Sequence, residues 1–264
     1  MHIQGNIPFQ PIAPPMGGPA PFQINTPPSV IPAPPLPGNP EAQLPRFLNY
    51  YADYSGCGHW RMIWPEQVMN AHSKAIVHGT TVMNVDPRYY GDVKGVRIQR
   101  QATPQQQQFV NFLRQLADKN KFRLIYEIDD ICFREDIPDY NKYKSAFENN
   151  DIRKASMEMM AMCDEITVTC PFMRDYYKEK TGNKNVTVIP NFMPKFWLDR
   201  FYDPGRTMQS FEKNKRKPRI LYAGSGAHFD VENRVKHKDD FYHVCDVIRK
   251  TADKYQWVFM GGHP

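Results

Sequence analysis

Short apolar runs alternate with amphipathic segments along the chain from residue 46 onward. Runs that read as strands begin at residue 46 and recur at 95–101, 122–128, 165–170 and 185–191. Helical patterns lie between them at 65–75, 103–121, about 143–162 and 171–182. Strands separated by helices of this length are typical of a parallel sheet covered on both faces. The sequence therefore predicts an α/β fold built on a doubly wound, Rossmann-like parallel sheet.

A second strand–helix–strand pattern follows after an irregular stretch. Its parts are a strand at 218–226, a helix at 239–255 and a strand at 257–262, two residues before the last residue, Pro264. A complete doubly wound domain needs on the order of 100 residues. We therefore expect two Rossmann-like domains, the second truncated, with the boundaries 46–195, a basic linker at 196–217, and 218–264.

Residues 1–45 differ in composition from the rest of the chain. They hold 14 of the 24 prolines, and Glu41 is their only charged side chain. Repeated X-Pro units favour extended polyproline II and cannot form a full hydrogen-bond ladder. We expect a disordered tail, with docking to a protein partner as the alternative.

Composition excludes several classes of protein. No run approaches 18 consecutive apolar residues, so no transmembrane helix is expected, and the start of the chain lacks the pattern of a secretory signal. The five cysteines are scattered without a C-x-x-C pair, which argues against a disulfide framework and against a zinc site. We expect a cytoplasmic protein.

The net charge of +6 is concentrated in one segment. Residues 213–219, KNKRKPR, carry five basic side chains and no acidic one, which leaves +1 for the rest of the chain. A run of this kind predicts a solvated connector, with contact to phosphate or another polyanion as the alternative.

Two adjacent carboxylates follow the apolar run in LIYEIDDICF, residues 124–133. Ligands of open parallel sheets bind in the crevice outside the carboxyl ends of the strands. Asp129 and Asp130 lie at such a strand end and are therefore candidate site residues. The alternative is that they are solvated strand ends that accept hydrogen bonds from nearby backbone N–H groups.

Glycine-bearing loops follow the first strand of each predicted domain. Gly56 and Gly58 lie in the first loop, and Gly224 and Gly226 lie in the second. Such a turn permits close approach of a phosphate to backbone N–H groups. The second loop lacks the full G-x-G-x-x-G pattern because Phe229 takes the third glycine position. A tight structural turn explains it equally well.

The order of several motifs resembles the GT-B glycosyltransferases, specifically the large retaining group called group 1 or family four. The motifs are IYEIDDICFREDIP (125–138), CDEITVTCPFMRDYYKEKTGNKNVTVIPNF (163–192), RILYAGSGAHFD (219–230) and WVFMGG (257–262). Each motif alone is of moderate specificity, and their order and spacing carry the resemblance. It covers roughly residues 46–264.

The resemblance implies transfer of a sugar, hexosyl in type, from a nucleotide-sugar donor with retention of configuration. The acceptor would dock on the first domain and the nucleotide on the second. No metal or other cofactor is implied, and the nucleotide-sugar is the co-substrate. Polysaccharide, a protein side chain and modified DNA all remain open as acceptors.

The resemblance also implies roles for individual residues. The donor-binding candidates are Gly56, Gly58, Gly224, Ser225, Gly226 and His228, the last in a G-S-x-x-H-x-D variant that includes Asp230. Asp129 and Asp130 match positions that face the transferred sugar or the acceptor hydroxyl and are the catalytic candidates. The candidates for phosphate contact are Arg61, Arg234 and Lys236, with Lys238 nearby. For Arg61 a surface salt bridge is the alternative.

The sequence also departs from the pattern of this group. A pair of glutamates spaced eight residues apart would fall beyond Pro264, and Phe192 stands where a glycine usually follows IPN. We therefore expect this chain alone to lack a complete donor site and to be inactive by itself.

Two other functions remain open on the sequence. Glu127 and Asp129 could hold a divalent ion in a D-x-D-like motif of a GT-A transferase. The basic run at 213–219 and the proline-rich arm could instead serve a non-enzymatic, polyanion-binding scaffold.

Overall fold

A computed structural model describes residues 44–54, 56–137, 139, 144–147, 150–195, 198–199, 203, 205, 209, 217–224 and 240–261. The chain forms two compact units. The described residues of 1–129 and 154–192 form the first unit, and those of 130–153 and 193–264 form the second. The proline-rich tail and most of the basic run, residues 213–216, lie outside the described residues.

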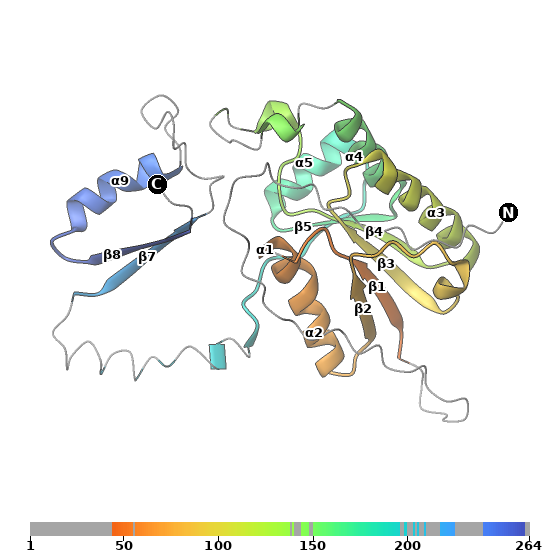
Figure 1. The fold of residues 1–264 in the computed structure, drawn as a ribbon, viewed down its shortest axis with the longest axis horizontal. Helices are drawn as coiled ribbons and strands as arrows, with labels where there is room; N and C mark the ends of the chain where they lie inside the picture. Colours follow the sequence, from red (N-terminus) through yellow and green to blue (C-terminus); the bar gives the residue numbers. More distant parts are fainter. Residues whose placement is uncertain are drawn as a thin grey trace. The chain divides into compact units, whose positions relative to one another are not determined.

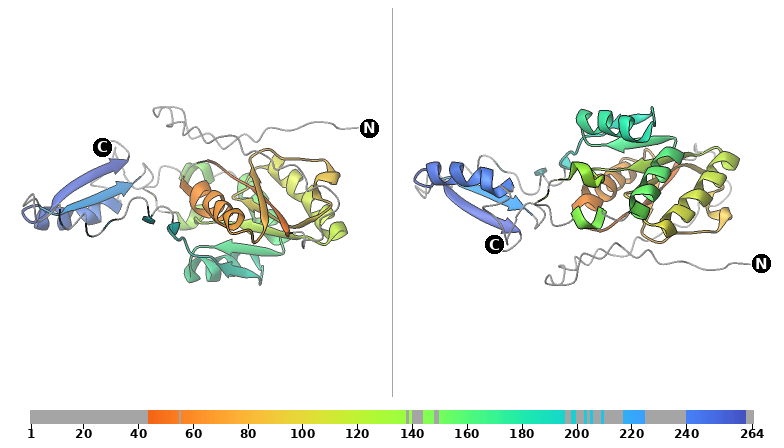
Figure 2. Two further views of the ribbon diagram at one scale, coloured as in Figure 1. Left: turned by 90° about the horizontal axis from the view of Figure 1, so that it is seen from below. Right: turned by 90° about the horizontal axis from the view of Figure 1, so that it is seen from above.

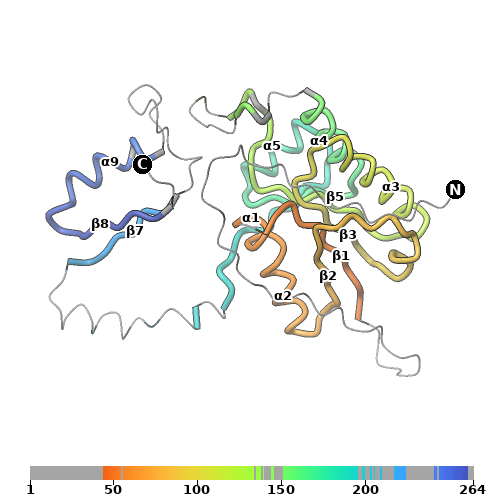
Figure 3. The backbone as a smooth tube through the Cα atoms, in the orientation of Figure 1, coloured from red at the N-terminus to blue at the C-terminus, as the bar shows by residue number. Residues whose placement is uncertain are grey.

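The first unit is built on a six-stranded sheet in which every pairing is parallel. In spatial order the strands are β2 (Ile76–Thr80), β1 (Arg46–Tyr50), β3 (Val93–Gln99), β4 (Arg123–Glu127), β5 (Glu165–Val168) and β6 (Val186–Val188) (Figure 1). The backbone goes from β1 to β2, then back past β1 to β3, and continues in one direction to β6 (Figure 3). The predicted doubly wound α/β fold is confirmed.

Helices cover both faces of this sheet. Asn49 and Tyr50 are consecutive residues of β1, so their side chains point to opposite faces. Asn49 contacts Glu66 of α2 (Trp64–Ala71), whereas the ring of Tyr50 contacts Phe109 of α3 (Pro104–Asn120). Helices α4 (Asn150–Met162) and α5 (Pro171–Thr181) follow later in the chain. Short 3₁₀ turns lie at Pro87–Tyr90, Arg134–Asp136 and Lys144–Phe147.

Helix α3 shows why the local sequence specifies these elements. Thr103 caps the helix through a reciprocal capping box with Gln106, and Pro104 occupies the first turn. Lys121 closes the helix in a left-handed conformation with φ of 61°. The buried face carries Phe109, Val110, Leu113, Leu116 and Ala117. The predicted helix at 103–121 is confirmed within one or two residues.

The structure differs from the sequence prediction in three places. Strand β2 was not predicted, because His78 and Gly79 interrupt its apolar pattern. The predicted glycine loop is instead the start of a helix, formed by α1 (Gly56–Gly58), the π-helical turn η1 (His59–Ile63) and α2. The predicted helix at 143–162 is divided into the 3₁₀ turn at Lys144–Phe147 and α4.

A carboxylate fixes α2 to the sheet. Glu66 accepts hydrogen bonds from Gly79 N at 3.2 Å, from Asn49 Nδ2 at 3.3 Å and from the Tyr51 hydroxyl. Burial raises the pKa of Glu66, and these three donors oppose that rise. A Cβ on Gly79 would lie 1.5 Å from the Tyr51 oxygen, so only glycine fits beneath this contact.

The second unit contains the predicted strand–helix–strand pattern. Strands β7 (Arg219–Gly224) and β8 (Gln256–Gly261) pair in parallel, with Arg219 opposite Gln256. Helix α9 (Asp240–Thr251) lies along these two strands (Figure 2). The ring of Phe241 on α9 contacts the rings of Tyr222 and Phe259. Among the described residues, no helix combines the length and the apolar character needed to cross a membrane.

Candidate functional site

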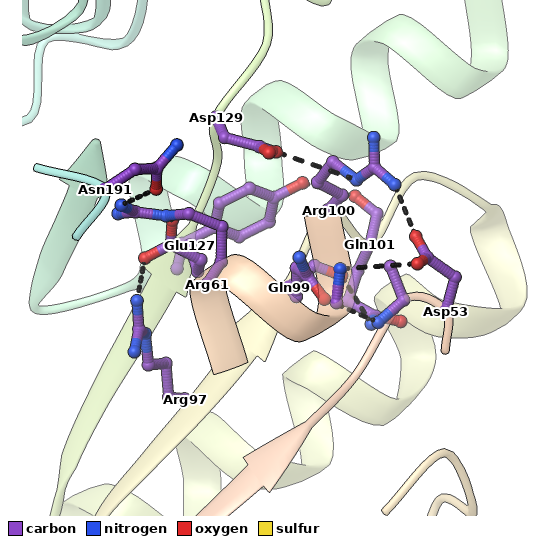
Figure 4. Close-up of polar contacts among 12 residues, drawn as sticks. Asp53, Arg61, Arg97, Gln99, Arg100, Gln101, Glu127, Asp129 and Asn191 are labelled. Carbon is purple, nitrogen blue, oxygen red and sulfur yellow. Dashed lines mark hydrogen bonds and ion pairs between the residues drawn. The ribbon is translucent and has the colours of Figure 1, made fainter. Parts of the chain in front are cut away.

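Three charged side chains meet at the carboxyl edge of the six-stranded sheet. Asp53 follows β1, Arg100 follows β3 and Asp129 follows β4 (Figure 4). Arg100 Nη2 lies 2.5 Å from Asp53 Oδ2, and Arg100 Nε lies 4.0 Å from Asp129 Oδ1. The arginine therefore joins the loop after the first strand to the predicted site residue Asp129.

The backbone of Arg100 is unusual at this position. Its φ is 44°, in the left-handed region that non-glycine residues rarely adopt. A backbone hydrogen bond from Arg100 N to Glu127 O at 3.0 Å, together with the ion pairs, holds this conformation. Backbone strain of this kind gathers at sites where the surrounding structure requires a particular side-chain direction.

The helix start that contains Gly56 and Gly58 lies against the charged side chains of Asp53, Arg100 and Asp129. Asp53 Oδ1 accepts a hydrogen bond from Gly58 N at 3.3 Å. A Cβ on Gly58 would lie 2.0 Å from Asp53 O, whereas one on Gly56 would meet nothing within 4 Å. Cys57 Sγ lies within 4.8 Å of an Asp129 carboxylate oxygen. The structure thus brings together Gly56, Gly58 and Asp129, which the sequence analysis singled out separately.

A buried carboxylate, Glu127, lies two residues before Asp129. Glu127 is 0% exposed and accepts hydrogen bonds from Arg61 Nε at 2.6 Å, from Arg97 Nη2 and from Thr167 Oγ1. Arg97, Glu127 and Thr167 belong to three neighbouring strands, and Arg61 reaches them from η1 (Figure 4). Removing one partner of such a pair leaves an uncompensated charge in a dry interior.

Arg61 therefore has a structural role, because its guanidinium is buried among protein acceptors. It is 2% exposed, and its Nη1 donates to the Ile189 carbonyl and, at 2.9 Å, to Asn191 Oδ1. The guanidinium links the helix start to the segment after β6. The surface salt bridge considered for this residue is wrong, because the ion pair with Glu127 is buried.

The same contacts bear on the divalent-ion alternative. Both carboxylate oxygens of Glu127 already accept hydrogen bonds from guanidinium or hydroxyl groups. The side chain has no exposure to solvent. Glu127 and Asp129 therefore do not fit a shared metal site of the D-x-D kind.

Sequence analysis missed Asp53, Arg100 and two glutamines, Gln99 and Gln101, that flank the arginine. Both glutamines are buried, and each has one amide atom without a hydrogen-bond partner among the described residues. The sequence Gln99-Arg100-Gln101 looks like any polar strand end. Its position in the candidate site follows only from the loops that the sheet places beside it.

The remaining predicted site residues are placed as follows. Asp130 is exposed and begins the described part of the second unit, and Gly224 is the last residue of β7. The others lie outside the described residues: Ser225, Gly226, His228, Asp230, Arg234, Lys236 and Lys238.

Comparisons with known proteins found no matching protein-family model and no matching curated protein. Among solved structures, the chain is similar to HepE of Anabaena in complex with UDP, at 7% identity and a TM-score of 0.45, over 83% of this chain and 69% of that one. It is also similar to UGT73P12 of Glycyrrhiza uralensis complexed with glycyrrhetinic acid 3-O-monoglucuronide, at 7% identity and a TM-score of 0.37, over 83% and 63% of the two chains.

A third similar structure is UGT89C1 of Arabidopsis thaliana complexed with UDP, at 7% identity and a TM-score of 0.33. The match covers 67% of this chain and 45% of that one, so the chain spans less than two thirds of either UGT protein. Similarities of this size do not assign the chain to a family.

Proposed function

We propose that this chain belongs to a GT-B glycosyltransferase that moves a sugar from a nucleotide-sugar donor to an acceptor. The observation that carries the proposal is the meeting of the Gly56–Gly58 helix start with Asp129 at the carboxyl edge, through Asp53 and Arg100. Ligands of open parallel sheets bind at this edge. The order of the sequence motifs supports the choice of reaction.

The chemistry assigns a role to each group. Asp129 accepts a hydrogen bond from a sugar hydroxyl or stabilises positive charge that develops at the anomeric carbon. Arg100 keeps this carboxylate oriented, and Asp130 is the second catalytic candidate. Gly56 and Gly58 let the donor phosphates approach the backbone N–H groups at the helix start.

The second unit completes the proposal on the donor side. Gly224 ends a parallel strand, the position from which a following turn can contact a phosphate. The proposed donor contacts that follow it are Ser225, Gly226, His228, Arg234 and Lys236. The reaction proceeds with retention, uses no obligatory metal, and takes a carbohydrate, protein or nucleic-acid acceptor.

The test is turnover of nucleotide-sugars by the full natural protein. A panel of UDP-, GDP- and ADP-sugars is incubated with the protein, and release of the nucleoside diphosphate is measured. We expect release from at least one donor, and we expect Asp129→Asn to lower kcat about 100-fold, as is typical when a preorganised electrostatic contact is removed.

Asp92→Asn is the matched control for this variant. Asp92 is 68% exposed and pairs with Arg46, the first residue of β1, at the opposite edge of the sheet. It should leave turnover unchanged. The proposal is wrong if no donor is consumed, or if Asp129→Asn is as active as Asp92→Asn.

A further inference from the structure

A cavity of about 590 Å³ lies at the amino edge of the six-stranded sheet, within the first unit. It is bordered by the carboxyl end of α3, the last turn of α4 and the residues that immediately precede β4, β5 and β6. Cavities of this volume are usual for small-molecule sites. Strand β4, five residues or about 17 Å long, separates it from the carboxyl edge. Its polar lining includes Arg114, Asp118, Lys121, Arg123, Asp164 and Asn185.

Arg114 compensates the negative groups of this cavity. Its Nη1 donates to Asp164 Oδ1 at 2.8 Å and to the Met162 carbonyl, at the end of α4, at 3.2 Å. Its Nη2 donates to Asp118 Oδ1 at 2.8 Å. The second oxygen of Asp164 accepts a hydrogen bond from Leu124 N at 2.8 Å. Both carboxylates are therefore paired with a cation that belongs to the fold itself.

Lys121 and Arg123 give the cavity an excess of positive charge. With them the lining holds three positive and two negative side chains, a net charge of +1. Arg123 Nη2 pairs with Glu165 at 3.0 Å, but the arginine side chain is 61% exposed and a guanidinium has five N–H donors. Burial raises the pKa of the Cys163 thiol, so the thiol stays neutral and adds no negative charge. The cavity therefore favours an anion.

The backbone of Lys121 gives a second, independent indication. Lys121 closes α3 with a φ of 61°, whereas Gly182 closes α5 with a φ of 71°. Glycine is the usual residue at such a helix end, because a Cβ disfavours the left-handed conformation. The Lys121 side chain has neither a hydrogen bond nor an ion pair with any residue that the structure describes. A lysine at this position is explained if its ammonium group binds a ligand.

Asn185 adds a hydrogen-bond acceptor to the same cavity. Its Nδ2 donates to the Asp164 carbonyl at 3.1 Å, which identifies the other amide atom as oxygen. Asn185 is exposed, and its Oδ1 has no partner within the described part of the chain. An amide oxygen accepts a hydrogen bond from a hydroxyl group, whereas an ionised phosphate has only acceptors to offer. A ligand that suits the whole lining is therefore an anion that also carries hydroxyl groups.

We propose that this cavity binds a small phosphate monoester that carries free hydroxyl groups. Lys121 and Arg123 bind the phosphate, whose charge of about −1.5 to −2 at pH 7 matches two cations. Asn185 Oδ1 accepts a hydrogen bond from a hydroxyl group of the ligand. The site lies at the edge of the sheet opposite the proposed transferase site, so it goes beyond the proposed function and does not depend on it. Water alone is the competing occupant.

The test is titration of the full chain with glycerol 3-phosphate and D-ribose 5-phosphate, followed by ¹H–¹⁵N NMR. We expect at least one of these esters to shift the backbone amide signals of Lys121, Phe122 and Asn185 in a saturable way. Glycerol and D-ribose, which lack the phosphate, should leave the three signals in place, and inorganic phosphate should bind more weakly than the ester.

Three results would overturn the proposal. The first is that neither ester shifts the three signals, as a cavity filled only by water predicts, or that the shifts are confined to Gly56 and Gly58 at the carboxyl edge. The second is that glycerol or D-ribose shifts the signals as its ester does. The third is that inorganic phosphate binds as tightly as the esters, because the hydroxyl contact would then contribute nothing.

Lys121→Gly gives a second measurement that separates binding from folding. The variant removes the ammonium group and supplies the residue that the left-handed position favours, so it should unfold at the same temperature as the unaltered protein or at a higher one. It should nevertheless bind the phosphate ester about tenfold more weakly, the equivalent of one lost charge-assisted hydrogen bond.

Lys119→Met is the matched control for this variant. Lys119 is an exposed lysine in the last turn of the same helix, and it is not among the residues that line the cavity. Its replacement should leave the affinity for the ester unchanged. Equal affinities of Lys121→Gly and Lys119→Met, whether both are unchanged or both are reduced, would overturn the site.

Discussion

At the scale of single residues, the candidate site depends on charges that compensate one another. Glu127 is held by two guanidiniums and a hydroxyl, and Arg100 lies between two carboxylates. Replacing one member leaves its partners with fewer compensating contacts. Single substitutions here should therefore cost more than the loss of one contact.

Arg61→Met removes the central cation of the buried cluster. We expect the free energy of unfolding to fall by about 3 to 5 kcal/mol, because buried Glu127 loses one of its two guanidinium partners and the Ile189 carbonyl loses a donor. Urea denaturation followed by circular dichroism measures it. Arg88→Met, at an exposed arginine, should leave the midpoint unchanged. Equal midpoints for both variants would contradict the structural role of Arg61.

The two glycines of the helix start make a matched pair. Gly58→Ala places a methyl group against Asp53 O and should lower the free energy of unfolding by about 1 to 3 kcal/mol. Gly56→Ala meets no atom within 4 Å and should be neutral or stabilising, because alanine favours helix. Thermal unfolding of both variants measures the difference. Equal destabilisation would refute the close approach at Gly58.

At the scale of elements, the sequence predicted a helix or strand correctly where its capping residues and its apolar pattern were both present. Helix α3 carries a cap, a proline in its first turn and an apolar face, and its limits were predicted closely. Strand β2 was missed because Gly79 and His78 weaken its pattern, although Gly79 is required by the contact between Tyr51 and Glu66. Tertiary packing requires a glycine at this position, and the local sequence pattern does not show that requirement.

The attachment of α2 predicts a dependence of stability on pH. Burial raises the pKa of Glu66 in the folded state above its unfolded value, so folding favours the protonated form. The stability from this group is full below the unfolded pKa and is lost as pH rises through the folded pKa. Glu66→Gln should therefore remove this loss, which makes the variant relatively more stable as pH rises from acid to neutral.

Urea denaturation at a series of pH values tests this expectation. The difference in unfolding free energy between Glu66→Gln and the unaltered protein should change steadily in favour of the variant. Glu179→Gln, at an exposed position of α5, is the control and should follow the unaltered protein. A constant difference across the series would show that Glu66 does not titrate differently in the folded state.

At the scale of the whole molecule, the sequence predicted two parallel α/β units, and the described residues form one six-stranded and one two-stranded parallel sheet. The strand ends were also predicted as the place of the site. The partners within it were not, because Asp53, Arg100 and Asp129 are separated by 47 and 29 positions and meet only through the order of β1, β3 and β4. Single-sequence patterns describe neighbours along the chain, not neighbours across a sheet.

The two units should differ in local stability. Val96 and Leu124 of the central strands are fully buried, whereas Leu221 of β7 is 56% exposed and Phe259 of β8 is 52% exposed. Amides of β3 and β4 should therefore exchange with solvent more slowly than those of β7 and β8. Native-state hydrogen exchange by mass spectrometry measures this. Equal protection in both units would contradict it.

The bonds from Arg61 to Ile189 and Asn191 also have a mechanical meaning. Strand β6 has only three residues and lies at the edge of the sheet, so it is a weak point of attachment for the chain that follows it. Tension applied beyond Phe192 reaches the guanidinium before it reaches β6. The buried ion pair between Arg61 and Glu127 transmits this force to β4, which is paired with β3 inside the sheet. Separating β6 from the sheet therefore requires breaking contacts of the inner strands as well.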